Sequence, residues 1–164
     1  MTLRRGELLG LKWEDIDLQN GIIHVRRQVA RVDGEVKELP LKTKNSYRNI
    51  SISQDAVAML TEMEAHRSSD YVFPSSTGGP ISPDSVNNML HRVLKRAGLP
   101  SIRFHDLRHT FATLALQNGV NIKTVSGMLG HFSAGFTLDT YAHVTTSAQK
   151  EAAKTMGNVL AVEY

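Results

Sequence analysis

Apolar residues recur at helical spacing in seven stretches of the chain, which we expect to form helices. The stretches are residues 2–11, 53 or 55 to 66, 82–96, 104–118, 122–129, 137–143 and 147–162. Ser82 and Pro83 suit the start of the third stretch, and Gly119 and Gly130 follow the fourth and the fifth. If the first helix begins at Thr2, Glu7 lies too far along it to complete a capping box.

Between the first two helices, the pattern changes to one that favours strands. β-forming residues fill 21–32, the pair Asp33-Gly34 is a strong hairpin-turn signal, and residues 36–41 return as a second strand. A polar tip at 42–47 leads to alternating residues at 48–52, which we expect to form a third strand. The sequence therefore predicts an α+β domain, mainly α-helical, with a small three-stranded antiparallel meander.

Composition narrows the class of protein only a little. A chain of 164 residues, 41% of them hydrophobic, is expected to form one compact domain. The net charge of +3 suits a nucleic-acid partner without requiring one. There is no cysteine for a disulfide or a thiolate metal site, and the sequence contains neither a long apolar run nor a signal-peptide pattern. We expect a cytoplasmic protein that does not associate with membranes.

The most informative residues are polar and lie far apart in the chain. Residues 105–109 read HDLRH, residues 129–131 read LGH, and Tyr141 follows. Arg4 lies near the start of the chain, and Lys42 lies in the polar tip. Arginine and lysine can neutralise a phosphate, imidazoles can carry protons, and a phenol can act as a nucleophile. Together these groups are suited to attack a phosphodiester without a metal ion.

The histidine cluster also has simpler explanations. His105, Arg108 and His109 would share one face of a helix, which could be an exposed polar surface. Alternatively, the two histidines could bind zinc. The zincin motif has a glutamate after its first histidine, whereas this chain has Asp106, and Arg108 would place a cation between the ligands.

The other residues, taken singly, are equally open to simple explanations. Arg4 could be surface charge, and a lysine in a polar tip is usually solubilising. His131 could cap the helix that precedes it, and Tyr141 could be a core ring. The ordered set of residues favours the phosphodiester chemistry over these separate explanations.

This set resembles the catalytic domain of the tyrosine recombinases, also called the phage integrase family. The family pattern is an arginine in an R-x-[SG]-E helix, a lysine on a β-hairpin, H-x-x-R-H, L-G-H, and a tyrosine nine or ten residues later. The matching residues here are Arg4, Lys42, His105, Arg108, His131 and Tyr141. The resemblance covers nearly the whole chain, and it is strongest to integrases of phages and conjugative transposons of Gram-positive bacteria.

The resemblance implies that residues 1–164 form an N-terminally truncated tyrosine recombinase catalytic domain. In the family, this domain usually begins well before the first arginine, and a core-binding domain that closes around DNA normally precedes it. Here Met1 stands three residues before Arg4. We therefore expect the first part of the catalytic domain and the core-binding domain to be absent.

The activity that the resemblance implies is site-specific DNA recombination, which would serve the integration or excision of a mobile element. Tyr141 would attack the scissile phosphate and leave a 3′-phosphotyrosine and a free 5′-hydroxyl. His105 would accept the proton of the phenol, whose ordinary pKa is about 10. Lys42, a better match to the family than Lys44, would protonate the leaving oxygen.

The remaining catalytic residues would stabilise the charge of the phosphate. Arg4 and Arg108 would clamp its non-bridging oxygens, and His131 would donate a further hydrogen bond to them. Because these groups would do the work of a metal ion, we expect the enzyme to need neither a metal nor another cofactor.

Double-stranded DNA is the partner that the family implies. A basic face would hold Arg4, Lys42, Lys44, Arg103 and Arg108, and further contacts are expected from Thr43 and His109. The apolar stripe of the last helix could pack on its own domain or on a neighbouring protomer; its members are Ala152, Ala153, Met156, Val159, Leu160 and Val162. We expect a homo-oligomer, a tetramer on DNA, for the full-length protein, and a monomer for this chain alone.

Three other functions fit parts of the sequence. A type IB topoisomerase shares the arginine, lysine and tyrosine chemistry, although the LGH segment and the small size favour a recombinase. A DNA-binding module without activity would result if the truncated first-arginine segment were not held in place. A zinc hydrolase would use His105 and His109, and metal analysis of the purified protein would identify it.

Overall fold

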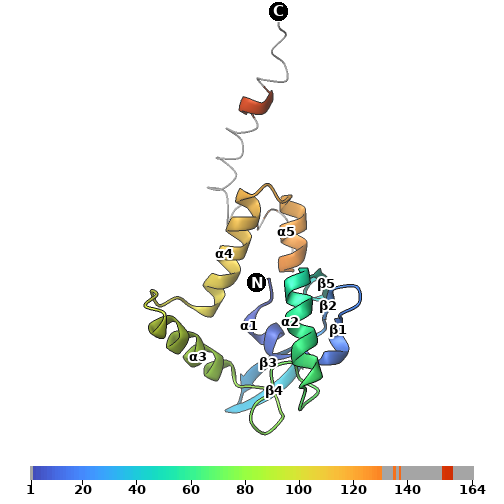
Figure 1. Cartoon of the computed structure of the whole chain (residues 1–164), viewed down its shortest axis with the longest axis vertical. Helices are drawn as coiled ribbons and strands as arrows, with labels where there is room; N and C mark the ends of the chain where they lie inside the picture. Colours follow the sequence, from blue (N-terminus) through green and yellow to red (C-terminus); the bar gives the residue numbers. More distant parts are fainter. Residues whose placement is uncertain (1, 131–134, 136, 138–152, 157–164) are drawn as a thin grey trace, which may run out of the picture.

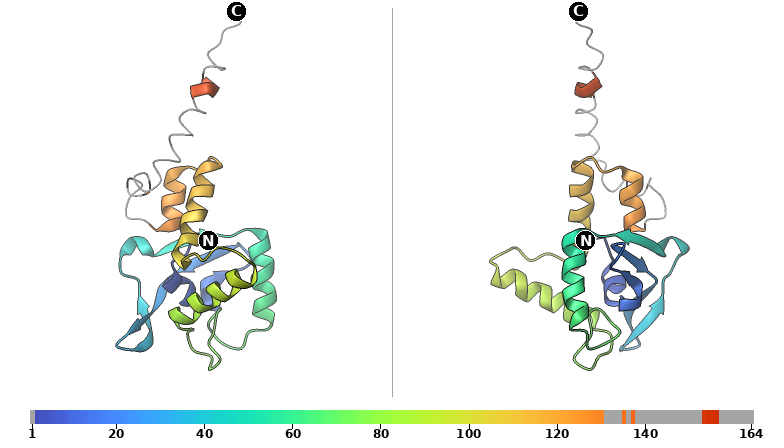
Figure 2. Two further views of the ribbon diagram at one scale, coloured as in Figure 1. Left: turned by 90° about the vertical axis from the view of Figure 1, so that its left-hand side faces the viewer. Right: turned by 45° about the vertical axis from the view of Figure 1, so that its right-hand side comes forward.

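The computed structural model describes residues 2–130, 135, 137 and 153–156. In chain order, its helices, 3-10 turns and strands are α1 (Arg5–Leu9), η1 (Trp13–Asp15), β1 (Ile16–Asp17), β2 (Ile22–Val25), β3 (Arg27–Val32), β4 (Glu35–Pro40), η2 (Lys44–Ser46), β5 (Arg48–Ser51), α2 (Gln54–Ala65), α3 (Pro83–Arg96), α4 (Phe104–Gln117) and α5 (Ile122–Leu129). The strands form a small β layer with α1 and α2 beside it (Figure 1). The pair α4 and α5 stands at one end, and the N-terminal segment lies near the base of this pair (Figures 1 and 2).

The strands form two antiparallel sheets instead of the single meander expected from the sequence. β2 is the central strand of a three-stranded sheet with the order β1-β2-β5, and β3 and β4 form a separate hairpin. The expected strand at 21–32 therefore breaks at Arg26, which lies between β2 and β3. The third strand, β5, pairs with β2 and not with β4, because this register places Ile50 opposite Ile23, and both side chains are buried. The expected small three-stranded antiparallel sheet is present, but its topology was predicted wrongly.

The β3–β4 hairpin has the turn that the sequence indicates. Asp33 and Gly34 both have positive φ angles, of 52° and 83°. This is the combination that a two-residue hairpin turn requires, and it follows the right-handed twist of the strands on either side.

The first helix is shorter than the sequence indicates. Arg4 has an extended backbone (φ −69°, ψ 154°), and α1 begins after it. The backbone N–H of Arg4 donates to Glu7 Oε2 at 2.8 Å, which fixes the start of the helix at this point. A helix from Thr2 was therefore a wrong prediction, and Glu7 is close enough to the true first turn to cap it.

Helix α1 packs directly on the hairpin. A Cβ atom added at Gly6 would lie 2.8 Å from the carbonyl oxygen of Val29 in β3, so only glycine allows this approach. Two apolar clusters support the arrangement. One lies between the sheet, α1 and α2, and the other joins α4 to α5 through Ala112, Leu116, Val125 and Leu129.

The helices from α2 to α5 agree with the sequence prediction. Ser53 and Ser82 are the N-caps of α2 and α3, and α5 covers 122–129 as expected. Of the last two expected helices, Thr137 and residues 153–156 are described and helical, and the rest lies outside the described residues. None of the helices in the described ranges is both long enough and apolar enough to cross a membrane.

Candidate active site

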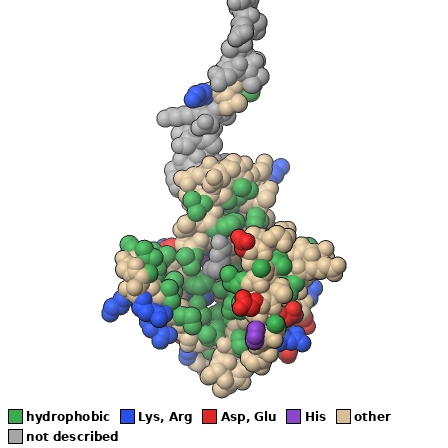
Figure 3. Space-filling model, in the orientation of Figure 1, with side chains coloured by type: hydrophobic (Ala, Val, Ile, Leu, Met, Phe, Trp, Pro, Cys, Tyr) green, Lys and Arg blue, Asp and Glu red, His purple; other side chains and the backbone are tan. Residues whose placement is uncertain are grey.

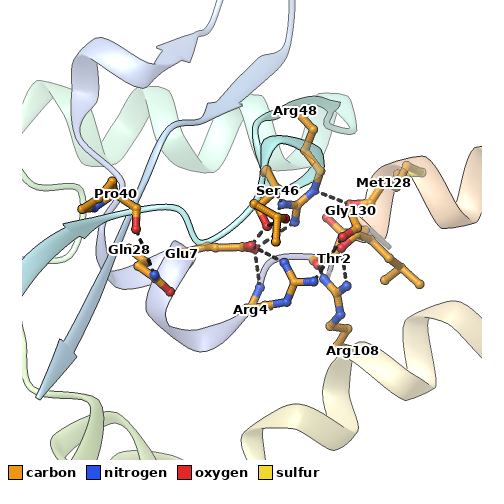
Figure 4. A network of polar contacts seen from close by, with 12 residues as sticks. Thr2, Arg4, Glu7, Gln28, Pro40, Ser46, Arg48, Arg108, Met128 and Gly130 are labelled. Carbon is orange, nitrogen blue, oxygen red and sulfur yellow. Dashed lines mark hydrogen bonds and ion pairs between the residues drawn. The ribbon is translucent and has the colours of Figure 1, made fainter. Parts of the chain in front are cut away.

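Several distant segments of the chain meet at the end of α5 (Figure 4). The last carbonyl groups of a helix have no partner within it and carry the negative end of its dipole. Here three consecutive carbonyls each accept a hydrogen bond from a different arginine: Met128 from Arg48 Nε (2.8 Å), Leu129 from Arg108 Nη2, and Gly130 from Arg4 Nη2 (3.1 Å). We call these three arginines the α5 arginine cluster. They come from the start of β5, from α4 and from the residue before α1.

A buried carboxylate joins two members of this cluster. The side chain of Glu7 is 2% exposed and accepts from Arg4 Nη1 at 2.7 Å and from Arg48 Nη2 at 2.8 Å. Burial raises the pKa of Glu7, but the hydrogen bonds and charge of Arg48, together with hydrogen bonds from Arg4, outweigh burial and hold this pKa below its usual value. Glu7 is therefore ionised at neutral pH and holds both guanidinium groups in fixed positions.

The third member of the cluster, Arg108, is buried. Its residue is 3% exposed, and its guanidinium donates to the carbonyl oxygens of Thr2 and Leu129. The simple alternative of an exposed polar surface therefore does not hold for Arg108, because those two carbonyls draw the side chain inward. Arg108 nevertheless lines a surface cavity of about 360 Å³.

That cavity brings together three of the expected catalytic residues. Arg4, His105 and Arg108 all line it, together with Arg103, Leu3, Arg5, Asn87 and Phe104. A second cavity, of about 220 Å³, also has Arg4 in its lining and is bordered by Lys42 and Thr43. Arg4 thus lies between the expected proton acceptor and the expected proton donor.

The expected proton acceptor is His105. It lies in the first turn of α4, and its ring packs edge to face on that of His109, with 4.6 Å between the ring centroids. Partial burial lowers the pKa of His105, and the positive charges of His109 and Arg108 lower it further. A neutral imidazole at neutral pH can accept a proton. No third His, Cys, Asp or Glu completes a metal site with this pair anywhere in the described part of the chain.

The loop before β5 carries the two candidate lysines. Lys42 follows the buried Leu41 and is exposed at the rim of the second cavity, whereas Lys44 belongs to η2 and lines neither of the two cavities. The Thr43 and Ser46 hydroxyls are 2.9 Å apart and hold the turn together. This placement supports Lys42 over Lys44 as the residue that acts beside Arg4.

Arg103, one of the expected DNA contacts, is highly exposed. Its side chain is 81% exposed, precedes α4 and pairs with Asp106 at 2.8 Å. The exposed pair leaves the guanidinium near solvent, where it can exchange partners at little cost. His131 and Tyr141, the two other expected catalytic residues, lie outside the described residues.

Sequence reasoning missed two features. Arg48 was assigned only to a strand, although strand alternation places it on the same side as the buried Ile50, and an arginine on the apolar side of a strand invites a partner. It also missed an exposed basic edge along α3, where Figure 3 shows Lys and Arg side chains gathered. The exposed residues of that edge are His91, Arg92, Lys95 and Arg96.

Comparison with known proteins identifies the family of this chain. Residues 1–148 match the model of the phage integrase family. A tyrosine recombinase XerC-like protein of Caldanaerobacter subterraneus subsp. tengcongensis is 34% identical over 182 residues, covering 96% of this chain and 46% of that protein. The ICEBs1 integrase of Bacillus subtilis is 31% identical, with the same two coverages. The chain therefore spans less than half the length of these curated relatives.

A solved structure has a similar fold. The Tn1549 transposon integrase, in complex with circular intermediate DNA, superposes with a TM-score of 0.82 at 25% identity, over 94% of this chain and 56% of that one. The fold is thus that of a known integrase. Since the family model matches most of the chain and relatives more than 30% identical cover nearly all of it, this chain belongs to the phage integrase family.

Proposed function

We propose that residues 1–164 form the catalytic domain of a site-specific tyrosine recombinase that integrates or excises a mobile element. The observation that carries this proposal is the convergence of Arg4, His105 and Arg108 on one cavity, with Lys42 on the other side of Arg4. These residues are far apart in sequence, and each supplies a group that phosphoryl transfer needs. Membership of the phage integrase family supports the same activity.

The first step is an attack on the scissile phosphate of double-stranded DNA. The phenol oxygen of Tyr141 forms a bond to phosphorus, and the bond from phosphorus to the 5′-oxygen breaks. The phenol proton passes to His105, whose lowered pKa keeps it neutral and able to accept. Lys42 gives a proton to the departing 5′-oxygen. The product is a 3′-phosphotyrosine, and reversal of the step with a different 5′-hydroxyl joins the new strand.

The arginines stabilise the charge that builds on the phosphate. Arg4 is 40% exposed at the cavity, and Arg108 lines the same cavity from below the surface. His131, which follows the carbonyls bound by the α5 arginine cluster, donates a further hydrogen bond. Removal of one preorganised donor of this kind typically slows a reaction by about 100-fold to 1000-fold. No metal ion takes part in this scheme.

DNA binding by this chain draws on exposed cations. Lys42, Lys44 and Arg103 lie near the two cavities or on the loop beside them, and the basic edge of α3 adds further charge. With about five phosphate contacts, the logarithm of the binding constant should fall with the logarithm of the salt concentration at a slope of about −4 to −5. The protein acts in the cytoplasm as a homo-oligomer on DNA.

Covalent trapping tests the proposed activity. A DNA duplex with a nick beside the cleavage site loses a short fragment after attack, so the protein stays attached. We expect the full-length wild-type protein to form a covalent adduct that survives denaturing gel electrophoresis. Tyr141→Phe should form none while retaining its affinity for DNA.

A second tyrosine provides the matched control. Tyr47 is 49% exposed and lies beside the loop that carries Lys42 and Lys44, which we call the lysine loop. Its phenol is therefore also accessible to DNA. Tyr47→Phe should form the adduct at the wild-type rate. An adduct that survives Tyr141→Phe and disappears with Tyr47→Phe would show that Tyr47, and not Tyr141, is the nucleophile. If neither the wild type nor any variant forms an adduct, the proposed function is rejected.

A further inference from the structure

Arg48, a residue outside the expected catalytic set, binds three separate segments of the candidate site. Its side chain is 7% exposed. Two of its nitrogens bind the Glu7 carboxylate at 2.8 and 3.1 Å, Nη1 also donates to the Ser46 carbonyl at 2.9 Å, and Nε donates to the Met128 carbonyl at 2.8 Å. One guanidinium therefore ties together α1, the end of the lysine loop and the end of α5 (Figure 4).

These contacts exceed what neutralisation of Glu7 requires. Arg4 already pairs with Glu7 at 2.7 Å, so a second cation is not needed to balance the charge. The additional bonds to Ser46 and Met128 depend on the planar fork of donors that arginine has and lysine lacks. The shape of the guanidinium, and not only its charge, therefore sets the relative positions of the three segments.

Each of the three segments holds or leads to a group of the proposed reaction. Glu7 fixes the guanidinium of Arg4, Ser46 closes the loop that begins at Lys42, and Met128 lies three residues before His131. The backbone at this point is also packed closely, because a Cβ atom at Gly130 would lie 3.0 Å from Arg48 Nη1. A shift of Arg48 would move all three groups relative to one another.

We propose that Arg48 is a positioning residue for strand cleavage, which acts by keeping Arg4, the Lys42 loop and the end of α5 in register, without touching the DNA. This inference rests on the proposed recombinase function. Displacement of catalytic groups by about 1 Å can slow a reaction by about 100-fold. The rate of cleavage by the folded protein, and not its affinity for DNA, is therefore the quantity that measures the positioning role of Arg48.

The test uses Arg48→Lys, which keeps the positive charge and loses the fork. The single-turnover rate constant of adduct formation is measured on the nicked duplex over a range of protein concentrations. We expect this rate constant at saturation to fall about 100-fold. The half-saturating concentration should change less than about threefold, because no group that contacts DNA is lost. A folding defect would lower the amplitude of the reaction and leave its rate constant unchanged.

Two further variants separate positioning from stability. Arg31→Lys makes the same change at an exposed arginine of β3, which pairs with Asp84 at 3.1 Å, and should cleave at the wild-type rate. Glu7→Gln with Arg48→Met removes the buried carboxylate together with Arg48, the more buried of its two partners. This double variant should unfold at a higher temperature than Arg48→Met alone and still cleave about 100-fold more slowly than wild type.

The outcomes are distinct. If the full-length wild-type protein forms no adduct, the recombinase function fails and the role of Arg48 fails with it. If the wild type cleaves and Arg48→Lys or the folded double variant cleaves within about threefold of it, only the positioning role is overturned. A slow Arg48→Lys with unchanged DNA affinity and full amplitude supports the positioning role.

Discussion

Replacement of Gly130 by alanine probes how tightly the end of α5 fits against Arg48. Gly130 has a φ of +63° and closes the helix in a left-handed conformation. A Cβ atom there would lie 3.0 Å from Arg48 Nη1, 3.1 Å from Cδ and 3.2 Å from Cζ. The side chain of Arg48 cannot swing away freely, because Glu7, Ser46 and Met128 all hold it.

Two terms contribute to the expected loss of stability. The left-handed conformation costs an alanine about 1–2 kcal/mol. Displacement of a packed neighbour adds about 1–3 kcal/mol. Gly119 provides the control, because its φ is +78° and no atom of the described residues lies within 4 Å of the added Cβ. Gly119→Ala should therefore show only the first cost, and the difference between the two variants measures the contact with Arg48.

The assay is urea unfolding followed by circular dichroism, with thermal unfolding as a second measurement. We expect Gly130→Ala to be less stable than Gly119→Ala by about 2 kcal/mol, which corresponds to about 4–8 °C in Tm for a domain of this size. Equal losses for the two variants would refute the argument, since they would mean that Arg48 does not pack tightly on the end of α5.

Three further predictions concern Glu7, Lys42 and Lys44. Because Glu7 has a lowered pKa, its ionised form stabilises the fold above the unfolded pKa of about 4.3, and this stability is lost as the pH falls through the folded pKa. Glu7→Gln should therefore lower the free energy of unfolding by about 3 kcal/mol at pH 7 and by less at pH 3.5, measured by urea unfolding. A difference in stability between wild type and Glu7→Gln that grows at acid pH would contradict this. Lys42→Ala should slow cleavage far more than it weakens DNA binding, and a 5′-bridging phosphorothioate, whose sulfur leaves without a proton, should restore its rate. Lys44→Ala should only weaken DNA binding and reduce the slope of binding against salt concentration by about one unit. If the phosphorothioate substrate restores cleavage by Lys44→Ala and not by Lys42→Ala, the roles of the two lysines are exchanged.

Local signals explain why much of the fold could be predicted. The serine and proline that open α3, the glycine that closes α5 and the Asp33-Gly34 turn each act on their immediate neighbours, and all three elements form as expected. The break at Arg26 and the pairing of β5 with β2 could not be predicted in this way. They depend on which distant strand places its apolar face in the core.

The candidate site shows the same division between local and distant contacts. The spacing of the motifs identified Arg4, His105 and Arg108, and the fold brings these three together. Their hydrogen bonds were not predictable, because Arg4 binds a carbonyl 126 residues away. Arg48 belongs to no motif that we recognised, and its importance arises only when Glu7, 41 residues away, folds against it. The burial of Arg108 likewise depends on carbonyls from two other segments.

The position of the covalent bond to DNA tests the central claim most directly. After trapping on the nicked duplex, the adduct is digested with a protease and a nuclease, and the modified peptide is sequenced by mass spectrometry. We predict a nucleotide joined through its 3′-phosphate to the phenol oxygen of Tyr141. Attachment at another residue, such as the exposed Tyr47, or attachment through a 5′-phosphate, would contradict the account.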